Sequence, residues 1–357
     1  MDEGKDIVAV SIPFAAGMAS AAYLPSGESY RYWAAAFCCA ALAAVFLLWC
    51  RRKGGLLLPF AAYFLLGFLG CTSSLLRGGG GLQAPEAASR ALGALCALLD
   101  SIPFPHQGSA PLVKALLAGV RDSLPRSTVQ TFRESGASHI LALSGLHLGI
   151  IYGMLGKVLS VLGKSRRASA LRSALIVTAC GAYALMTGLG PSIVRAFLFI
   201  TLREIGKIFP SRKPTPLRIY CTALLLQLCF SPAVIKTVGF QLSYLAMLGI
   251  FTLFPVLRAW YPGKSELDPA GRIWTSMALS LSCQIFTAPL VWLYFRSFPL
   301  HFLLTNLIAL PLTEALVICA VCTLLLQVLG INWVFPVRAT DFLAETLRLC
   351  LETISTM

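Results

Sequence analysis

Residues 299–328 read PLHFLLTNLIALPLTEALVICAVCTLLLQV, and this run sets the fold class of the chain. It holds one carboxylate, Glu314, and one histidine, His301, among residues that are otherwise apolar or uncharged. A helix of about 20 such residues crosses the hydrocarbon core of a bilayer. The run therefore predicts a membrane-spanning segment. Because it is long for one straight span and contains Pro311, we expect two half-helices or a hairpin.

Runs of similar length recur along the whole chain. Hydrophobic residues make up 57% of the 357 residues and charged residues 12%, whereas a soluble domain carries about 25% charged residues. We therefore expect an all-α, polytopic membrane protein with about ten transmembrane helices and additional interfacial amphipathic helices. The expected spans cover residues 7–24, 32–50, 55–76, 139–162, 171–190, 192–209, 217–235, 238–257, 273–295 and 299–328.

Basic residues are concentrated in alternate loops, and this sets the expected orientation. The net charge is +14, yet sixteen lysines and arginines lie in four loops, at 50–55, 157–172, 203–218 and 258–272. Cytoplasmic loops are enriched in lysine and arginine, so the alternation predicts that these loops and the N-terminus lie in the cytoplasm. Topology therefore accounts for most of the positive charge without any nucleic acid.

The same alternation puts the long connection at 77–138 outside the cytoplasm. Its amphipathic segments near 88–99, 111–121 and 127–135 are expected to lie in the membrane interface. The tail carries Asp341, Glu345, Arg348 and Glu352 at spacings of four, three and four, which again predicts an interfacial helix. We accordingly divide the chain into an N-terminal three-helix region (1–76), an extracytoplasmic linker with an amphipathic helix (77–110), a main membrane domain (111–330) and a C-terminal amphipathic helix (331–357).

Metal, cofactor and nucleotide motifs are not found in this sequence. Most of the twelve cysteines lie in apolar spans, where we interpret them as small core residues. No cysteine pair has metal-ligand spacing with a nearby histidine, so we assign no metal and no cofactor. A GxxxxGK[ST] stretch is also absent, so any motor must be another protein.

Three stretches together are specific. They read LLAGVRDSLPRSTVQTFRESGASHILALSGLHLGI (116–150), YALMTGLGPSIVRAF (183–197) and VGFQLSYLAMLGIF (238–251). In that order and at these separations they resemble the membrane-embedded competence domain of the ComEC family, the inner-membrane channel for DNA in natural transformation. A fourth stretch at 280–312 continues the resemblance.

The resemblance also sets expectations by what this sequence lacks. Members of the ComEC family carry an extracytoplasmic OB-like domain and usually a metallo-β-lactamase-like zinc domain with an HxHxDH motif, and neither pattern occurs here. The region at 77–110 is too short for a five-stranded barrel. The resemblance therefore implies a competence-type channel domain at 111–330 that acts as a channel and not as an enzyme.

His139 and His147 lie eight residues apart in an apolar stretch that we expect to be one helix, 139–162. His139 is expected near the outer membrane edge. A polar ring as deep as that of His147 usually faces protein or a cavity, so we expect Ser144 and His147 to form a polar strip along the DNA passage. A Ser–His hydrolase would also need an orienting acid and an oxyanion hole, which the nearby sequence does not supply. Gly145, Gly149 and Gly153 follow the small-xxx-small spacing of a helix-packing stripe.

The step TGLGPSIVR (187–195) ends one expected span and starts the next. Ser192 and Arg195 then lie in the first turn of a helix, where backbone N–H groups and a guanidinium favour a phosphate. Snorkelling of Arg195 to the outer interface is the alternative. Gln241 and Glu314 complete the expected passage, although an amide commonly serves as interhelical glue and a carboxylate in a span can be protonated and silent.

An external basic set could draw a DNA strand toward the passage, although interfacial snorkelling predicts the same pattern. The set consists of Lys114, Arg121, Arg126 and Arg133.

The sequence thus leads to the hypothesis of an inner-membrane channel that passes single-stranded DNA into the cytoplasm. Two alternatives stay open: a small-molecule or lipid transporter of the same fold, and a scaffold that needs a separately encoded OB-like or nuclease partner. The expected partners are single-stranded DNA and membrane lipids. A helicase motor, single-strand binding proteins, a separate nuclease and a second copy of the chain are partners that the sequence leaves open.

Overall fold

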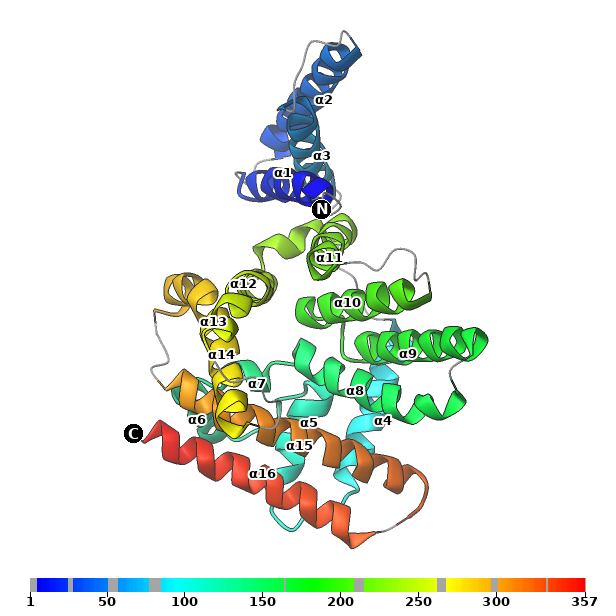
Figure 1. Ribbon diagram of the computed structural model, residues 1–357, viewed down its shortest axis with the longest axis vertical. Coiled ribbons are helices and arrows are strands. Elements are labelled where there is room, and N and C mark those ends of the chain that lie inside the picture. The colour runs from blue at the N-terminus through cyan, green and yellow to red at the C-terminus, as the bar shows by residue number, and fades with distance from the viewer. Residues whose placement is uncertain are drawn as a thin grey trace. The chain divides into compact units, whose positions relative to one another are not determined.

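The computed structural model describes residues 5–24, 28–50, 57–76, 85–163, 165–208, 215–261, 268–296, 301–331 and 333–356. Within these ranges every regular element is a helix (Figure 1). Six of the described helices are long and apolar enough to cross a membrane, which confirms an all-α, polytopic membrane protein. These six segments are Leu58–Leu76, Gly145–Leu162, Arg166–Met186, Val238–Ala259, Pro269–Phe295 and Phe302–Val328.

The remaining four of the ten expected spans also form helices, but these are shorter in their apolar part or carry more charge. Three contain the apolar segments Ile7–Ala22, Tyr30–Val45 and Pro216–Phe230. The fourth, Pro191–Ile208, includes Arg195, Arg203, Glu204 and Lys207. Length and composition therefore support six spans clearly, and the number ten stays a prediction.

The chain forms two compact units. Unit 1 comprises Met1–Gln83 and Leu198–Tyr244, and unit 2 comprises Ala84–Phe197 and Leu245–Met357. Their limits differ from the four ranges expected from the sequence, which stay predictions. Unit 1 contains α1 (Lys5–Ala22), α2 (Glu28–Cys50), α3 (Leu57–Leu76), part of α10 (Pro191–Ile208), α11 (Pro216–Phe230), η3 (Pro232–Lys236) and the first half of α12 (Val238–Thr252).

Unit 1 is held together by a glycine-mediated crossing of α1 and α3. A Cβ added at Gly17 would overlap the carbonyl oxygen of Phe64, and one added at Gly67 would overlap that of Phe14. Small residues let membrane helices approach this closely and gain dispersion contacts along their backbones. Neither glycine was predicted as a packing residue from the sequence.

Unit 2 is built around two antiparallel helices, α15 and α16, which lie side by side (orange and red in Figure 1). Short helices from the long connection pack against them and share one apolar core with them. Unit 2 also contains the start of α10 and the second half of α12. Its other helices are α4 (Glu86–Asp100), α5 (Ser109–Ala118), α6 (Arg126–Glu134), α7 (Ser138–Leu141), α8 (Gly145–Val158), η1 (Leu159–Leu162), α9 (Arg166–Met186), α13 (Phe254–Ala259) and α14 (Pro269–Phe295), with α15 at Phe302–Val328 and α16 at Val334–Ser355.

Several expectations about these elements are wrong. α15 is one continuous helix through Pro311, so it is neither two half-helices nor a hairpin. The expected helix 139–162 is interrupted, since α7 ends at Leu141 and α8 begins at Gly145. The expected interfacial helix near 111–121 corresponds to α5, most of whose residues are buried in the core of unit 2. Its apolar residues contact protein on several sides, which a helix lying at a lipid interface does not require.

The long connection follows α15 along its length. The Oγ1 of Thr305, near the start of α15, donates a hydrogen bond to the carbonyl oxygen of Ser135 (2.6 Å). Near the other end, Gln327 lines a pocket together with Pro103 and Pro105. Thr305 and Gln327 are 22 residues apart, or about 33 Å along a helix. The long connection thus contacts both ends of a helix that is about as long as the bilayer core is thick. If α15 crosses the bilayer, the whole of 77–138 cannot stay outside it.

Of the four residues in the expected charged stripe of α16, Asp341 faces inward. Its carboxylate is almost fully buried and accepts hydrogen bonds from His106 Nδ1 (2.7 Å), the His106 backbone N–H (3.1 Å) and Ser109 Oγ (2.7 Å). The other three charges, Glu345, Arg348 and Glu352, form an ion-paired group on the flank of the same helix. The face of α16 that carries Asp341 therefore packs against protein, because a buried carboxylate needs partners. The interfacial position of this helix stays a prediction.

The Asp341 contact makes a specific prediction for stability. Replacing Asp341 with Ala removes the acceptor of three hydrogen bonds at once, so we expect a loss of about 3 kcal/mol or more in the free energy of unfolding. The matched variant Glu352→Ala removes a half-exposed ion pair and should cost less than about 1 kcal/mol. Thermal unfolding of both purified variants in detergent checks this, and equal midpoints would contradict it.

The same contact should depend on pH. The hydrogen bond to Asp341, and then its charge, raise the pKa of His106 above 6.5, while Glu345 adds to this and Arg348 opposes it. Burial acts to raise the pKa of Asp341, but hydrogen bonds from Ser109 and His106 outweigh it and hold that pKa below 3.8. The His106 contribution is complete below pH 6.5 and is lost as the pH rises through the raised value. The Asp341 contribution is complete above pH 3.8 and is lost as the pH falls through the lowered value.

We therefore expect the contact to be strongest between pH 3.8 and pH 6.5. The difference in unfolding midpoint between the wild type and His106→Ala should shrink from about pH 6 to about pH 9, as the imidazole loses its proton. A difference that stays constant over this range would show that the imidazolium form does not strengthen the contact.

Candidate functional site

The N-terminus of α8 is closed by a reciprocal cap. The Ser144 hydroxyl accepts the Leu146 N–H (3.2 Å), and His147 Nδ1 accepts the Ser144 N–H (3.2 Å). Because Nδ1 is an acceptor here, the neutral ring carries its proton on Nε2. His147 is fully buried, and its Nε2 has no hydrogen-bond partner within the described part of the chain. The cap thus aims one unmatched N–H donor into the interior of unit 2.

The turn before α10 is strained. Gly188 has φ 84° and Leu189 has φ 55°, so two successive residues adopt the left-handed conformation. Glycine does this without cost, whereas a side chain there costs about 1–2 kcal/mol. The Leu189 N–H bonds the carbonyl oxygen of Ala184 (3.0 Å), which closes α9, and α10 begins two residues later at Pro191. The turn therefore fixes where the first turn of α10, with Ser192 and Arg195, lies.

The N-termini of α8 and α10 lie against each other. A Cβ at Gly145 would lie 3.2 Å from the Ala196 Cβ, 3.5 Å from Arg195 Nη2 and 3.9 Å from the Ser192 carbonyl oxygen. Arg195 itself is buried, with 9% of its surface exposed. Two helix N-termini, each with a partial positive charge, thus meet beside a buried guanidinium. This arrangement favours an anionic oxygen, such as one of a phosphate.

α14 reaches the same place from another side. Cys283 lies within electrostatic reach of Arg195, and its Sγ lies 3.9 Å from the carbonyl oxygen of Ala246 in α12. A Cβ at Gly249 would overlap the carbonyl oxygen of Ser282, so α12 and α14 cross at contact distance. Arg195 therefore lies at the contact of α8 and α10, with Cys283 of α14 near it in unit 2.

The sequence pattern of the Competence protein family matches residues 116–357, more than half of the chain and all of the residues just described. The chain belongs to the Competence protein family. Among curated proteins, ComE operon protein 3 of Bacillus subtilis strain 168 is 25% identical over 203 residues. That match covers 57% of this chain but only 24% of the relative, so the chain corresponds to a part of that protein. No solved structure matches the chain.

The polar strip that the sequence predicts from Ser144 and His147 along the passage stays a prediction. Both side chains are engaged in the cap, and His147 is directed inward. His139 lies on the separate helix α7, exposed, with its Nδ1 3.2 Å from the carbonyl oxygen of Gly136. The two histidines therefore do not share a helix, because the backbone leaves the helical conformation at Ala142.

The expected glycine stripe is seen at one of its three positions. Gly145 packs against α10, as described above. A Cβ at Gly149 or Gly153 would meet no other described atom within 4 Å. The close helix approach expected at these two positions is not found inside the described chain.

The external basic residues differ in how far their charges are exposed to solvent. Lys114 lies in α5, largely buried, and its ammonium is paired with Asp100. Arg121, Arg126 and Arg133 are exposed. Their three charges are partly balanced by two nearby acids, which leaves a net charge of +1 over residues 121–134.

The place of Gln241 and Glu314 in the expected passage stays a prediction. The Gln241 side chain, in unit 1, donates to the Ile235 carbonyl oxygen (2.8 Å) and to Tyr23 Oη (3.3 Å), as interhelical amides commonly do. Glu314 lies on the exposed face of α15, away from its buried face of Thr313, Leu316 and Val317. The structure thus gathers Gly145, Ser192 and Arg195, with the Ser144–His147 cap at the same helix end.

Two contacts of the family region were missed by sequence reasoning. Tyr183 Oη donates to the carbonyl oxygen of Leu117 at the end of α5 (2.8 Å), and Thr305 bonds Ser135 in the same way. Both satisfy carbonyl groups at the ends of short buried helices, which would otherwise lack partners. The only sign of such a contact in the sequence is a tyrosine or threonine within an apolar span. The sequence does not show which carbonyl group accepts its hydrogen bond.

The tight contact at Gly145 makes a prediction with a matched control. Gly145→Val should overpack the junction of α8 and α10, lower the free energy of unfolding by about 1–3 kcal/mol and displace Arg195. Gly153→Val, on the open face of the same helix, should leave stability nearly unchanged. Thermal unfolding of the two variants in detergent tests this. Equal losses would show that the valine itself, and not the junction, is responsible.

Proposed function

We propose that this chain takes part in DNA uptake during competence, as the part of an inner-membrane channel through which single-stranded DNA enters the cytoplasm. The proposal rests on membership of the Competence protein family and on the similarity to ComE operon protein 3. It also includes the orientation expected from the basic loops, with the N-terminus in the cytoplasm.

The meeting of α8 and α10 at Arg195 is the observation that carries the proposal. A polyanion that enters a membrane needs positive groups that are already oriented, because few counter-ions or waters accompany it. Two helix N-termini and one guanidinium supply such groups without recognising a base. The site therefore suits a phosphodiester backbone of any sequence.

His147 would add a neutral donor to the same wall. Its Nε2–H is buried and has no partner among the described residues, so an oxygen of a passing phosphate or a water could accept from it. A neutral donor suits transport, since a strand that moves must be held weakly at each position. The approach to this wall would be lined by His139 and by the exposed Arg121, Arg126 and Arg133. Because the net charge of that region is small, another protein would capture the DNA first.

Energy and strand processing would come from partners. A separate helicase motor would supply the energy, because the family region of this chain carries no nucleotide-binding loop. Cytoplasmic single-strand binding proteins and a separate nuclease would receive and process the strands.

Replacing Arg195 tests the proposal directly. In a transformable host that depends on this chain, Arg195→Gln should lower transformation frequency about tenfold or more, since a buried guanidinium–phosphate contact is lost. The matched control Arg203→Gln changes an exposed arginine of the same helix and should transform normally. Membrane levels of both variants are measured alongside.

DNase-resistant uptake of labelled DNA, measured in the same strains, separates passage from binding at the surface. Normal uptake by Arg195→Gln at normal membrane levels would overturn the proposed site. Normal transformation after deletion of the gene would overturn the channel and leave a transporter of another substrate.

A further inference from the structure

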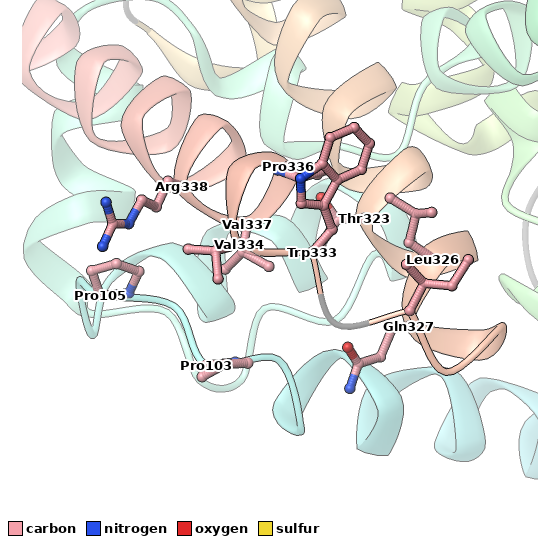
Figure 2. A pocket seen from close by; sticks show the side chains of 11 residues that line it. Pro103, Pro105, Thr323, Leu326, Gln327, Trp333, Val334, Pro336, Val337 and Arg338 are labelled. Atoms are coloured by element: carbon pink, nitrogen blue, oxygen red, sulfur yellow. The ribbon is translucent and has the colours of Figure 1, made fainter.

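A cavity of about 280 Å³ lies where α15 ends and α16 begins, in unit 2. Its walls come from three places: the loop after α4, the last turns of α15 and the first turns of α16 (Figure 2). Three of the eleven lining residues are prolines: Pro103, Pro105 and Pro336. Proline has no backbone N–H, so these walls offer few hydrogen-bond donors and suit an apolar chain. The volume is close to the lower limit of about 300 Å³ for small-molecule pockets.

The polar groups of the cavity are few. Figure 2 shows Arg338 beside Pro105 at one side, and Gln327 at the other. The Arg338 guanidinium has no ion-pair or hydrogen-bond partner within the described part of the chain. The nearest acid along α16, Asp341, is already occupied by His106 and Ser109. The cavity therefore presents one uncompensated positive charge next to an apolar wall.

The cavity also lies at the end of a candidate membrane span. The apolar segment of α15 ends at Val328, and the following turn exposes Trp333 and Phe335, whose rings lie 6.4 Å apart. Exposed aromatic residues at the end of a span are typical of the membrane–water interface. The ligand available at the membrane–water interface is lipid. Its phosphate would lie at the level of Arg338, and its acyl chains would extend along α15 toward the bilayer core.

We propose that this cavity binds one anionic phospholipid. Arg338 would hold the phosphate, Gln327 would bond the glycerol or headgroup oxygens, and the first part of an acyl chain would lie against Pro103, Leu326 and Val334. One cation and an apolar wall fit a single phospholipid better than a nucleic acid, which needs several cations along its backbone. The inference does not depend on the proposed DNA channel.

The loop wall of the cavity is held by the Asp341 contact. His106 follows Pro105 directly and bonds the carboxylate of Asp341, one turn after Arg338 on α16. The two walls are therefore fixed relative to each other before any lipid arrives, which lowers the entropy cost of binding.

Native mass spectrometry of the full chain tests the proposal. The protein is purified in a neutral detergent and offered equal amounts of phosphatidylglycerol and phosphatidylcholine with identical acyl chains. We expect retention of phosphatidylglycerol in roughly fivefold preference, the effect of one arginine near an anionic headgroup. Arg338→Gln should bring the ratio to near one, whereas Arg338→Lys should keep a preference because the charge remains.

Arg90→Gln is the matched control, since Arg90 is an exposed arginine of the same unit that does not line the cavity. It should leave the ratio unchanged. An equal ratio for the wild type, an unchanged ratio for Arg338→Gln or an equal fall for Arg90→Gln would each overturn the proposal.

Fluorescence locates the lipid. Phosphatidylglycerol with brominated acyl chains should quench the protein, and the quenching should be smaller in Trp333→Phe, which removes the indole at the cavity. Inorganic phosphate at millimolar concentration should not displace the lipid. Displacement by phosphate, or equal quenching in Trp333→Phe, would overturn a lipid as the occupant.

Discussion

A polar group that leaves water must find its partner inside the protein, and this constraint organises unit 2. The buried carboxylate of Asp341 accepts three hydrogen bonds from a loop that lies more than two hundred residues earlier in the chain. The end of α5 is satisfied by a tyrosine of α9, and the end of α6 by a threonine of α15. Each contact joins the long connection to a distant helix, because a short buried helix cannot satisfy its own last carbonyl groups.

Close backbone approach is the second organising feature, and it is produced by a few glycines. Gly17 and Gly67 permit the crossing of α1 and α3 in unit 1, while Gly145 and Gly249 permit crossings in unit 2. Between apolar helices in lipid the hydrophobic effect gives little preference, so contacts at the backbone itself decide which helices associate. At Gly145 the consequence extends beyond packing, since the approach brings two helix N-termini together beside Arg195.

The two proposed binding places therefore arise from the same physics with different results. At Arg195 a buried guanidinium and two helix ends concentrate positive potential inside unit 2, which suits a polyanion that passes. At Arg338 a single exposed guanidinium lies beside an apolar wall, which suits a lipid that stays. A membrane lipid would supply the phosphate at Arg338, and the incoming strand would supply it at Arg195.

The sequence by itself determined the membrane class, the helical architecture, the start of α10 to within one residue and the family. Apolar run length, helix-start residues and motif spacing are local properties. Only the tertiary structure decided that the helix expected from His139 is broken, that α5 is buried and that Asp341 faces inward. It also decided which glycine of the 145–153 stripe lies at a helix contact. Periodicity identifies a polar or small residue on a helix, but its partner lies far along the chain, and only packing determines whether that residue faces lipid, water or protein.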